Sequence, residues 1–167
     1  MNRREILSTV GTTALGCGLL AAVAAGPSTA KSTKEIVGSW TLVTADGFGP
    51  SPLGSLMFDR DGRFSAIFVR RDIPRYLSNS RMQGTPDDYK STVTGSVAAF
   101  GTYALSGTDL NLHVEGSTFP NWIGTDQKRC NVTVSDTELT YTQPTPSAGG
   151  PPAVMVWKRA AVLASAS

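Results

Sequence analysis

Residues that build metal and nucleophilic sites are scarce in this chain of 167 residues. It contains one histidine, His113, and two cysteines. Structural zinc sites combine four cysteine or histidine ligands, so the composition excludes one. No serine lies in a Gly-x-Ser-x-Gly motif, and no glycine-rich phosphate-binding loop is present. We therefore expect neither a serine hydrolase of that type nor a metal or other cofactor.

Charge is also low and evenly divided between the two signs. The chain has fifteen lysines and arginines and thirteen aspartates and glutamates, which gives a net charge of +2. No basic stripe with interleaved aromatic residues is present, and such a stripe is the usual mark of a nucleic-acid-binding surface. We therefore expect no nucleic-acid partner.

The first thirty residues have the pattern of an export signal. Arg3 and Arg4 precede a weakly apolar run over 10–25, and Ser28-Thr29-Ala30 supplies the small residues of a cleavage site. Glycine and threonine within the run, and the lack of a charged far flank, argue against a membrane span. The paired arginines favour the twin-arginine route, with a general secretory signal as the alternative. We predict a signal peptide at 1–30, a folded domain at 31–160 and a disordered tail at 161–167, in a periplasmic or secreted protein without stable membrane insertion.

The rest of the chain is a series of short β-branched and aromatic runs separated by turns. Eight strands are expected, and one short helix should begin where Thr85 caps Pro86 and two aspartates. Repeating βα units are absent, so the pattern predicts an all-β protein, an antiparallel barrel or sandwich. The expected strands are 36–43, 56–58, 63–69, 97–105, 110–116, 127–134, 139–142 and 154–157.

The segment 113–127 has the densest group of polar and aromatic residues. His113 and Glu115 are followed by a turn that contains Phe119, Asn121 and Trp122. Such a turn is suited to the mouth of a small-ligand cavity, where apolar walls carry a few polar groups.

The motif Gly38-Ser39-Trp40 resembles the Gly-x-Trp motif that opens lipocalin barrels, in which the tryptophan packs beneath an arginine of the last strand. Arg159 is in the position of that arginine, so Gly38, Trp40 and Arg159 are assigned structural roles. Nearly all of the mature chain is similar to the bacterial and fungal lipocalin-like domain family, in segments 36–40, 61–63, 71–76, 100–103, 113–122 and 124–127.

The resemblance implies a small, calycin-type antiparallel β-barrel of about eight strands with an internal apolar cavity. It implies little about activity, because related barrels include both carriers and cofactor-free enzymes. One departure is Leu112, where family members often carry a second histidine, and this weakens any role that requires two imidazoles.

Alternation leaves two orientations open for the strand at 110–116. If His113 and Glu115 point into the barrel, about 7 Å apart along the strand, Glu115 orients the imidazole and His113 carries a proton. Arg129 would then tune the carboxylate, and Tyr103 would be a proton donor. Alternatively, Asn111, His113 and Glu115 face water while Leu110, Leu112 and Val114 fill the barrel. In the later strand Cys130 alternates with Val132 and Val134, so we expect it to be a small buried residue rather than a nucleophile.

The leading hypothesis is an exported barrel that binds a small, mostly apolar molecule. Its candidate ligand-binding residues are Phe100, Phe119, Asn121, Trp122 and Arg70. The first alternative is a cofactor-independent isomerase, cyclase or lyase that uses His113, Glu115, Arg129 and Tyr103. The second is a structural or protein-binding barrel with a filled interior.

Overall fold

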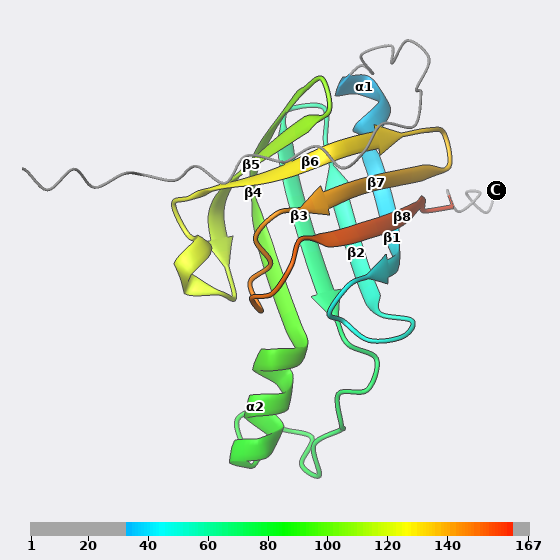
Figure 1. Ribbon diagram of the computed structural model, residues 1–167. Coiled ribbons are helices and arrows are strands. Elements are labelled where there is room, and N and C mark those ends of the chain that lie inside the picture. Colours follow the sequence, from blue (N-terminus) through cyan, green and yellow to red (C-terminus); the bar gives the residue numbers. More distant parts are fainter. Residues whose placement is uncertain (1–32, 162–167) are drawn as a thin grey trace, which may run out of the picture.

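The computed structural model describes residues 33–161, which form one closed antiparallel barrel of eight strands (Figure 1). Each strand pairs with the next in sequence, and the last returns to pair with the first. The prediction of an all-β barrel with a short helix is confirmed. The expected signal peptide and residues 162–167 of the expected tail lie outside the described residues.

The strand and helix boundaries follow the sequence pattern closely. The first expected strand is wrong at its start, because Ile36 ends a short helix and the strand begins only at Gly38, whose φ of 132° suits glycine alone. The elements are α1 (Thr33–Ile36), β1 (Gly38–Ala45), β2 (Leu53–Phe58), β3 (Arg63–Val69), α2 (Pro86–Gly95), β4 (Ser96–Ser106), β5 (Asp109–Ser117), η1 (Pro120–Trp122), β6 (Asp126–Val134), β7 (Glu138–Gln143) and β8 (Ala153–Arg159).

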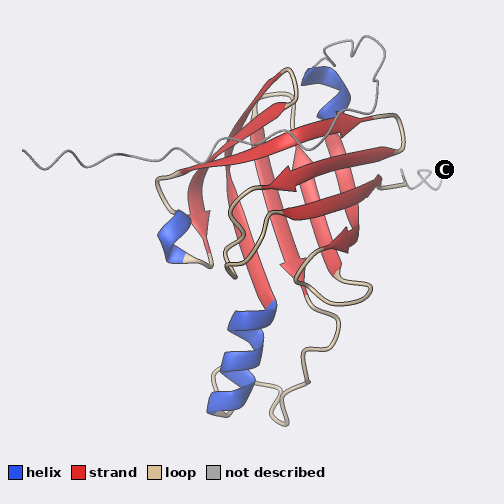
Figure 2. Ribbon diagram, in the orientation of Figure 1, coloured by secondary structure: helices blue, strands red, loops and turns tan. Residues whose placement is uncertain are grey.

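The barrel has two distinct ends. At one end the short turns between β2 and β3, β4 and β5, and β6 and β7 lie near α1. At the other end, which we call the open end, lie the β1–β2 and β7–β8 loops, η1 and the excursion through α2. Figure 2 shows α2 projecting away from the strands at this open end.

Helix α2 begins with the capping arrangement that the sequence predicts. The Asp88 backbone N–H donates to the Thr85 hydroxyl at 3.2 Å, and the Thr85 N–H donates to the Asp88 carboxylate at 2.8 Å. These bonds satisfy two amides that the first helical turn leaves without partners. No helix in residues 33–161 combines the length and the apolar character needed to cross a membrane.

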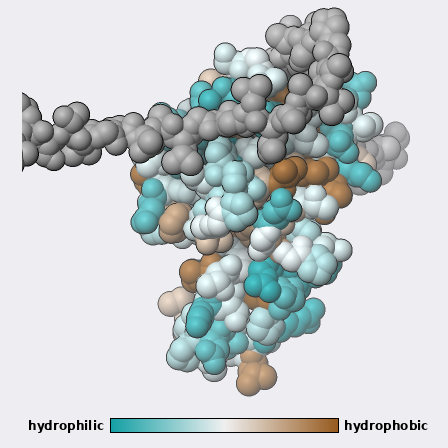
Figure 3. All heavy atoms as spheres, viewed as in Figure 1, coloured by the Kyte–Doolittle hydropathy of each residue, from teal (hydrophilic) through white to brown (hydrophobic). Residues whose placement is uncertain are grey.

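Strand alternation places the core inside the barrel. Leu110, Leu112 and Val114 of β5 are buried, whereas Asn111, His113 and Glu115 are exposed. The outward orientation of the polar β5 residues is therefore the one that the structure shows. The visible face of the molecule is correspondingly polar, with hydrophobic residues in separate small areas (Figure 3).

A bulge in β6 changes which of its residues face inward. Between the pairs Cys130↔Thr142 and Thr133↔Thr140, β6 advances three residues while β7 advances two. Asn131 takes up the extra residue with a φ of 54°. As a result Arg129, rather than Cys130, shares the barrel interior with Val132 and Val134, which corrects the predicted grouping. Cys130 itself is buried, as expected.

Candidate ligand-binding site

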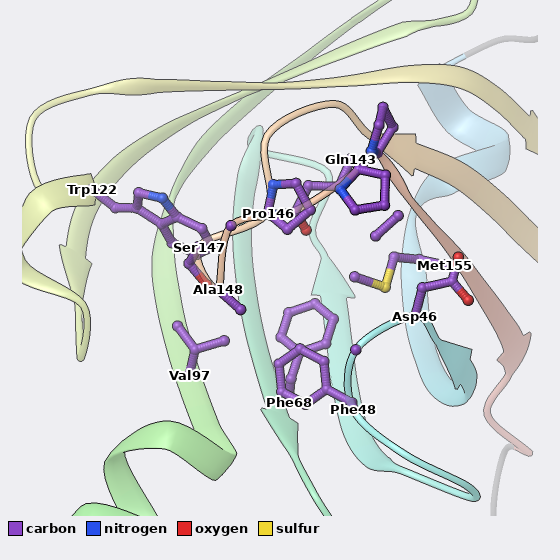
Figure 4. A pocket seen from close by; sticks show the side chains of 15 residues that line it. Asp46, Phe48, Phe68, Val97, Trp122, Gln143, Pro146, Ser147, Ala148 and Met155 are labelled. Carbon is purple, nitrogen blue, oxygen red and sulfur yellow. The ribbon is translucent and has the colours of Figure 1, made fainter.

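An apolar pocket, which we call the mouth pocket, lies at the open end of the barrel (Figure 4). It has a volume of about 250 Å³ and an apolar lining. The Phe48 and Phe68 rings pack against each other there, with centroids 5.6 Å apart. Trp122 of η1 and Met155 of β8 supply two further walls, and the β7–β8 loop covers part of the opening.

Two polar side chains in the mouth pocket have hydrogen bonds within the protein. The Asp46 carboxylate accepts a bond from the Val154 backbone N–H at 3.0 Å. The buried Gln143 side chain donates to the Thr145 carbonyl at 3.4 Å. These contacts leave the hydrophobic wall as the main surface that the pocket offers to a ligand.

A second, much smaller space lies inside the barrel, and we call it the inner space. Its volume is about 20 Å³, roughly enough for one water-sized group. Phe68 and Trp122 line both this space and the mouth pocket, so the two are separated by shared side chains. The core fills most of the interior, so the mouth pocket is much the larger of these two spaces.

Among the described residues, Arg129 is the only charged one that lines the inner space. Its side chain is brought inside by the register of β6 before the Asn131 bulge, and the residue is 5% exposed. Its Nη1 donates to the Lys128 carbonyl at 2.9 Å, and its guanidinium carbon lies 5.9 Å from the centre of the Trp122 ring. Its Nε is buried and has no hydrogen-bond partner among residues 33–161.

Burial shapes the electrostatics of this interior. Loss of solvent lowers the pKa of Arg129, and nearby Tyr141 partly offsets this effect. The same burial raises the pKa of Tyr141, against the opposing influence of the Arg129 charge. Arginine keeps its proton in proteins, so the interior carries a positive charge whose desolvation costs several kcal/mol unless an anion compensates it.

A comparison with protein families identifies the fold independently. Residues 37–160 match the model of the lipocalin-like domain. This chain belongs to the lipocalin-like domain family. No curated protein matches the chain. Membership of this family indicates, in general terms, a barrel that binds small molecules.

The lipocalin-like domain has its histidine on the outer surface of the barrel. His113 Nδ1 lies 2.8 Å from an Asp126 carboxylate oxygen, and both side chains are more than half exposed. Glu115 accepts two hydrogen bonds of 2.8 Å from the Arg63 guanidinium, which lowers the pKa of Glu115, mainly through those bonds. Within residues 33–161 no three His, Cys, Asp or Glu side chains come together in a group that could hold a metal ion.

Tyr103 lies toward the opposite end from the mouth pocket. Its hydroxyl donates to the Asp59 carbonyl at 2.8 Å, and its ring meets Phe58 edge-on with centroids 4.7 Å apart. Partial burial raises the pKa of Tyr103. The four residues proposed for acid–base chemistry are therefore not brought together: Arg129 is inside, His113 and Glu115 are outside, and Tyr103 packs near the β2–β3 turn.

Of the five predicted ligand-binding residues, Trp122 lines the mouth pocket, and Phe119 packs on it with ring centroids 5.8 Å apart. Phe100 is on the outer face and is 51% exposed. Asn121 is exposed, and Arg70 pairs with Asp72 at 2.6 Å.

Several lining residues were not among the predicted ones. For the lining residues on strands, alternation with exposed neighbours is a sequence signal that could have identified them. The lining residues in the long loops have no such signal. They include Phe48, Phe68, Val97, Gln143, Ala148 and Met155.

Proposed function

We propose that this protein is an exported lipocalin-like barrel that binds a small, mostly apolar molecule in its mouth pocket. The observation that supports this proposal is an apolar pocket at the open end of a closed barrel, with Phe48, Phe68 and Trp122 in its wall. Concave apolar sites with few polar groups are typical of small-molecule binding, and the mouths of β-barrels are a common place for them.

The size of the mouth pocket limits the ligand. Its volume of about 250 Å³ is just below the range of roughly 300–1,000 Å³ for ligand sites in general. A compact molecule of up to about three fused rings, or with a short alkyl chain, is therefore favoured over a long lipid. Export is supported by the sequence of residues 1–30, and the intact mass of the protein from its natural source tests whether this segment is removed.

The binding proposal is tested with an uncharged fluorescent probe, 1-aminoanthracene, titrated into the exported protein. Ala148 lies on the loop at the edge of the mouth pocket and is exposed. Ala148→Phe adds a ring at the opening, and we expect it to weaken probe binding by about tenfold or more, by the usual cost of overfilling a site. Thr145→Phe is the matched control, because Thr145 is exposed on the same loop but does not line the pocket.

His113→Gln provides a second control, because it removes a side chain on the outer face of the barrel and is expected to leave probe affinity unchanged. An absence of saturable probe binding would refute the proposal, as would equal weakening by Ala148→Phe and Thr145→Phe. Mass spectrometry of small molecules that co-purify with the protein then identifies the natural ligand.

A further inference from the structure

We propose that the ligand carries a carboxylate and that Arg129 binds it, with the apolar part of the ligand in the mouth pocket. This inference rests on the proposed small-molecule function and specifies the chemical class of the ligand. Three independent features of the barrel interior support it: the missing counter-ion of Arg129, the type of polar atoms left without partners, and the size and position of the inner space.

The ion pairs of the described residues lie on the surface, where they contribute least. Four basic side chains are within 2.6–2.8 Å of a carboxylate, and all have appreciable exposure. Arg129 is the basic residue for which pairing matters most, because it is buried, and within residues 33–161 it has no ion pair. The surface pairs are Arg63–Glu115, Arg70–Asp72, His113–Asp126 and Lys128–Asp109.

The unpartnered polar atoms of the interior are all donors. Among the described residues, the buried side-chain nitrogen and oxygen atoms without a hydrogen-bond partner are Arg129 Nε and Trp157 Nε1. Both residues approach the Tyr141 hydroxyl: burial raises the pKa of Tyr141, and the Arg129 charge and the hydrogen-bonding contacts of Trp157 and Arg129 lower it. A guanidinium and an indole N–H can only donate. The group that would complete this interior is therefore an acceptor, and a negatively charged one is favoured beside Arg129.

The inner space restricts that acceptor to a compact group. About 20 Å³ has room for roughly one oxygen-sized group. One oxygen of a carboxylate fits this limit better than a phosphate or a sulfonated ring. Phe68 and Trp122 line both spaces, so the proposed ligand passes between these two side chains to reach from Arg129 into the mouth pocket.

The position of the Asp46 carboxylate in the mouth pocket also agrees with a ligand carboxylate bound near Arg129. Within the part of the chain that the structure describes, Asp46 is the only charged residue that lines the mouth pocket. Figure 4 shows Asp46 and Trp122 on opposite sides of it. A carboxylate held on the Trp122 side is therefore kept away from the Asp46 carboxylate. The combined geometry points to a small monocarboxylic acid with an apolar tail.

The test compares octanoate with octan-1-ol, which have chains of the same length and differ in charge. Each competes with 1-aminoanthracene for the exported protein at neutral pH. We expect octanoate to bind at least about tenfold more tightly than octan-1-ol, as a charge-assisted hydrogen bond provides. In Arg129→Met the preference should disappear, whereas 1-aminoanthracene affinity should be retained. Arg63→Met, which removes a surface arginine, should leave the preference intact.

The stability of the ligand-free protein distinguishes two roles for Arg129, ligand binding and packing of the core. Replacing an uncompensated buried charge with an apolar side chain of similar length is neutral or stabilising. We expect the urea midpoint of Arg129→Met to equal or exceed that of the wild type. Octanoate should raise the midpoint of the wild type but not that of the variant. A lower midpoint in Arg129→Met together with an unchanged octanoate preference would assign Arg129 to packing and overturn the proposal.

Failure of this inference is distinguishable from failure of the proposed function. If 1-aminoanthracene binds to the wild type but octanoate has no advantage over octan-1-ol, the carboxylate inference is wrong and the small-molecule function stands. That comparison needs the wild type alone, so it holds even if Arg129→Met does not fold. If the probe, octanoate and octan-1-ol all fail to bind, the proposed function is wrong as well.

Discussion

The Arg159 guanidinium lies over the ring of Trp40, with its central carbon 4.1 Å from the ring centre. Its Nε donates to the Asp136 carbonyl at 2.6 Å, and its two terminal nitrogens donate to the carbonyls of Val37 at 3.0 Å and Glu35 at 2.8 Å. One side chain therefore joins the end of β8, the approach to β1 and the β6–β7 turn. This cluster lies at the end of the barrel opposite the mouth pocket, so its role is structural.

Arg159→Met should destabilise the protein by about 3 kcal/mol, because it removes a cation–π contact and several charged hydrogen bonds. Arg159→Lys keeps the charge but not the planar donor geometry, so an intermediate loss is expected. Urea denaturation measures both. Lys158→Met, at the exposed neighbouring residue, should change stability by less than about 0.5 kcal/mol. Equal effects at 158 and 159 would contradict the assigned role.

Gly101 is required by a close approach of two strands. A Cβ atom at this position would lie 1.9 Å from the His113 carbonyl oxygen, beside the irregularity where β4 and β5 change register. Gly101→Ala should therefore lower stability by about 3 kcal/mol or more, since backbone rather than a flexible side chain must move. Thermal unfolding compared with Thr102→Ala, at the next residue of β4, tests this. A Gly101→Ala protein as stable as the control would show that β4 and β5 can move apart with little loss of stability.

Glu115 should make stability depend on acid pH. Its two hydrogen bonds from Arg63 lower its pKa below the ordinary value of 4.5. Because the pKa of Glu115 is lower in the folded protein than in the unfolded chain, Glu115 contributes to the free energy of unfolding. This contribution is fully present above the unfolded-state pKa and is lost as the pH falls through the folded-state pKa.

Wild type should therefore have a higher urea midpoint than Glu115→Gln at pH 7, and the gap should close as the pH falls below about 4.5. The effect should be small and should weaken with added salt, because both partners are partly exposed. Glu138→Gln removes an exposed carboxylate outside the four ion pairs and serves as control. A gap that stays constant from pH 7 to pH 3 would contradict this linkage.

Much of the barrel was predictable because local signals and the global fold agree. Strand 63–69 was predicted with the boundaries that β3 has, and the alternation over β5 correctly defines Leu110, Leu112 and Val114 as one face. The Thr85 cap and Pro86 likewise mark the start of α2. Alternation alone could not decide which β5 face points inward, because both orientations satisfy a period of two.

The candidate site was less predictable. Trp122 was identified from the concentration of aromatic residues in its turn, but Phe100 has similar chemistry and lies outside the barrel. Phe48 and Ala148 reach the mouth pocket from loops, whose paths leave no periodic pattern in the sequence. The inward position of Arg129 depends on the strand register before the Asn131 bulge, and a bulge is recognised only once two strands are paired.

The sequence by itself determined the all-β class and the succession of strands along the chain, because these follow from alternation and turn chemistry. The resemblance of Gly38-Ser39-Trp40 to a lipocalin motif added the packing of Trp40 with Arg159. Only the tertiary structure decided that His113 and Glu115 are on the outside, that Arg129 is inside with no counter-ion among the described residues, and that an apolar pocket lies at the mouth. These features depend on how the strands close into a barrel, and closure sets which face of every strand loses its contact with water.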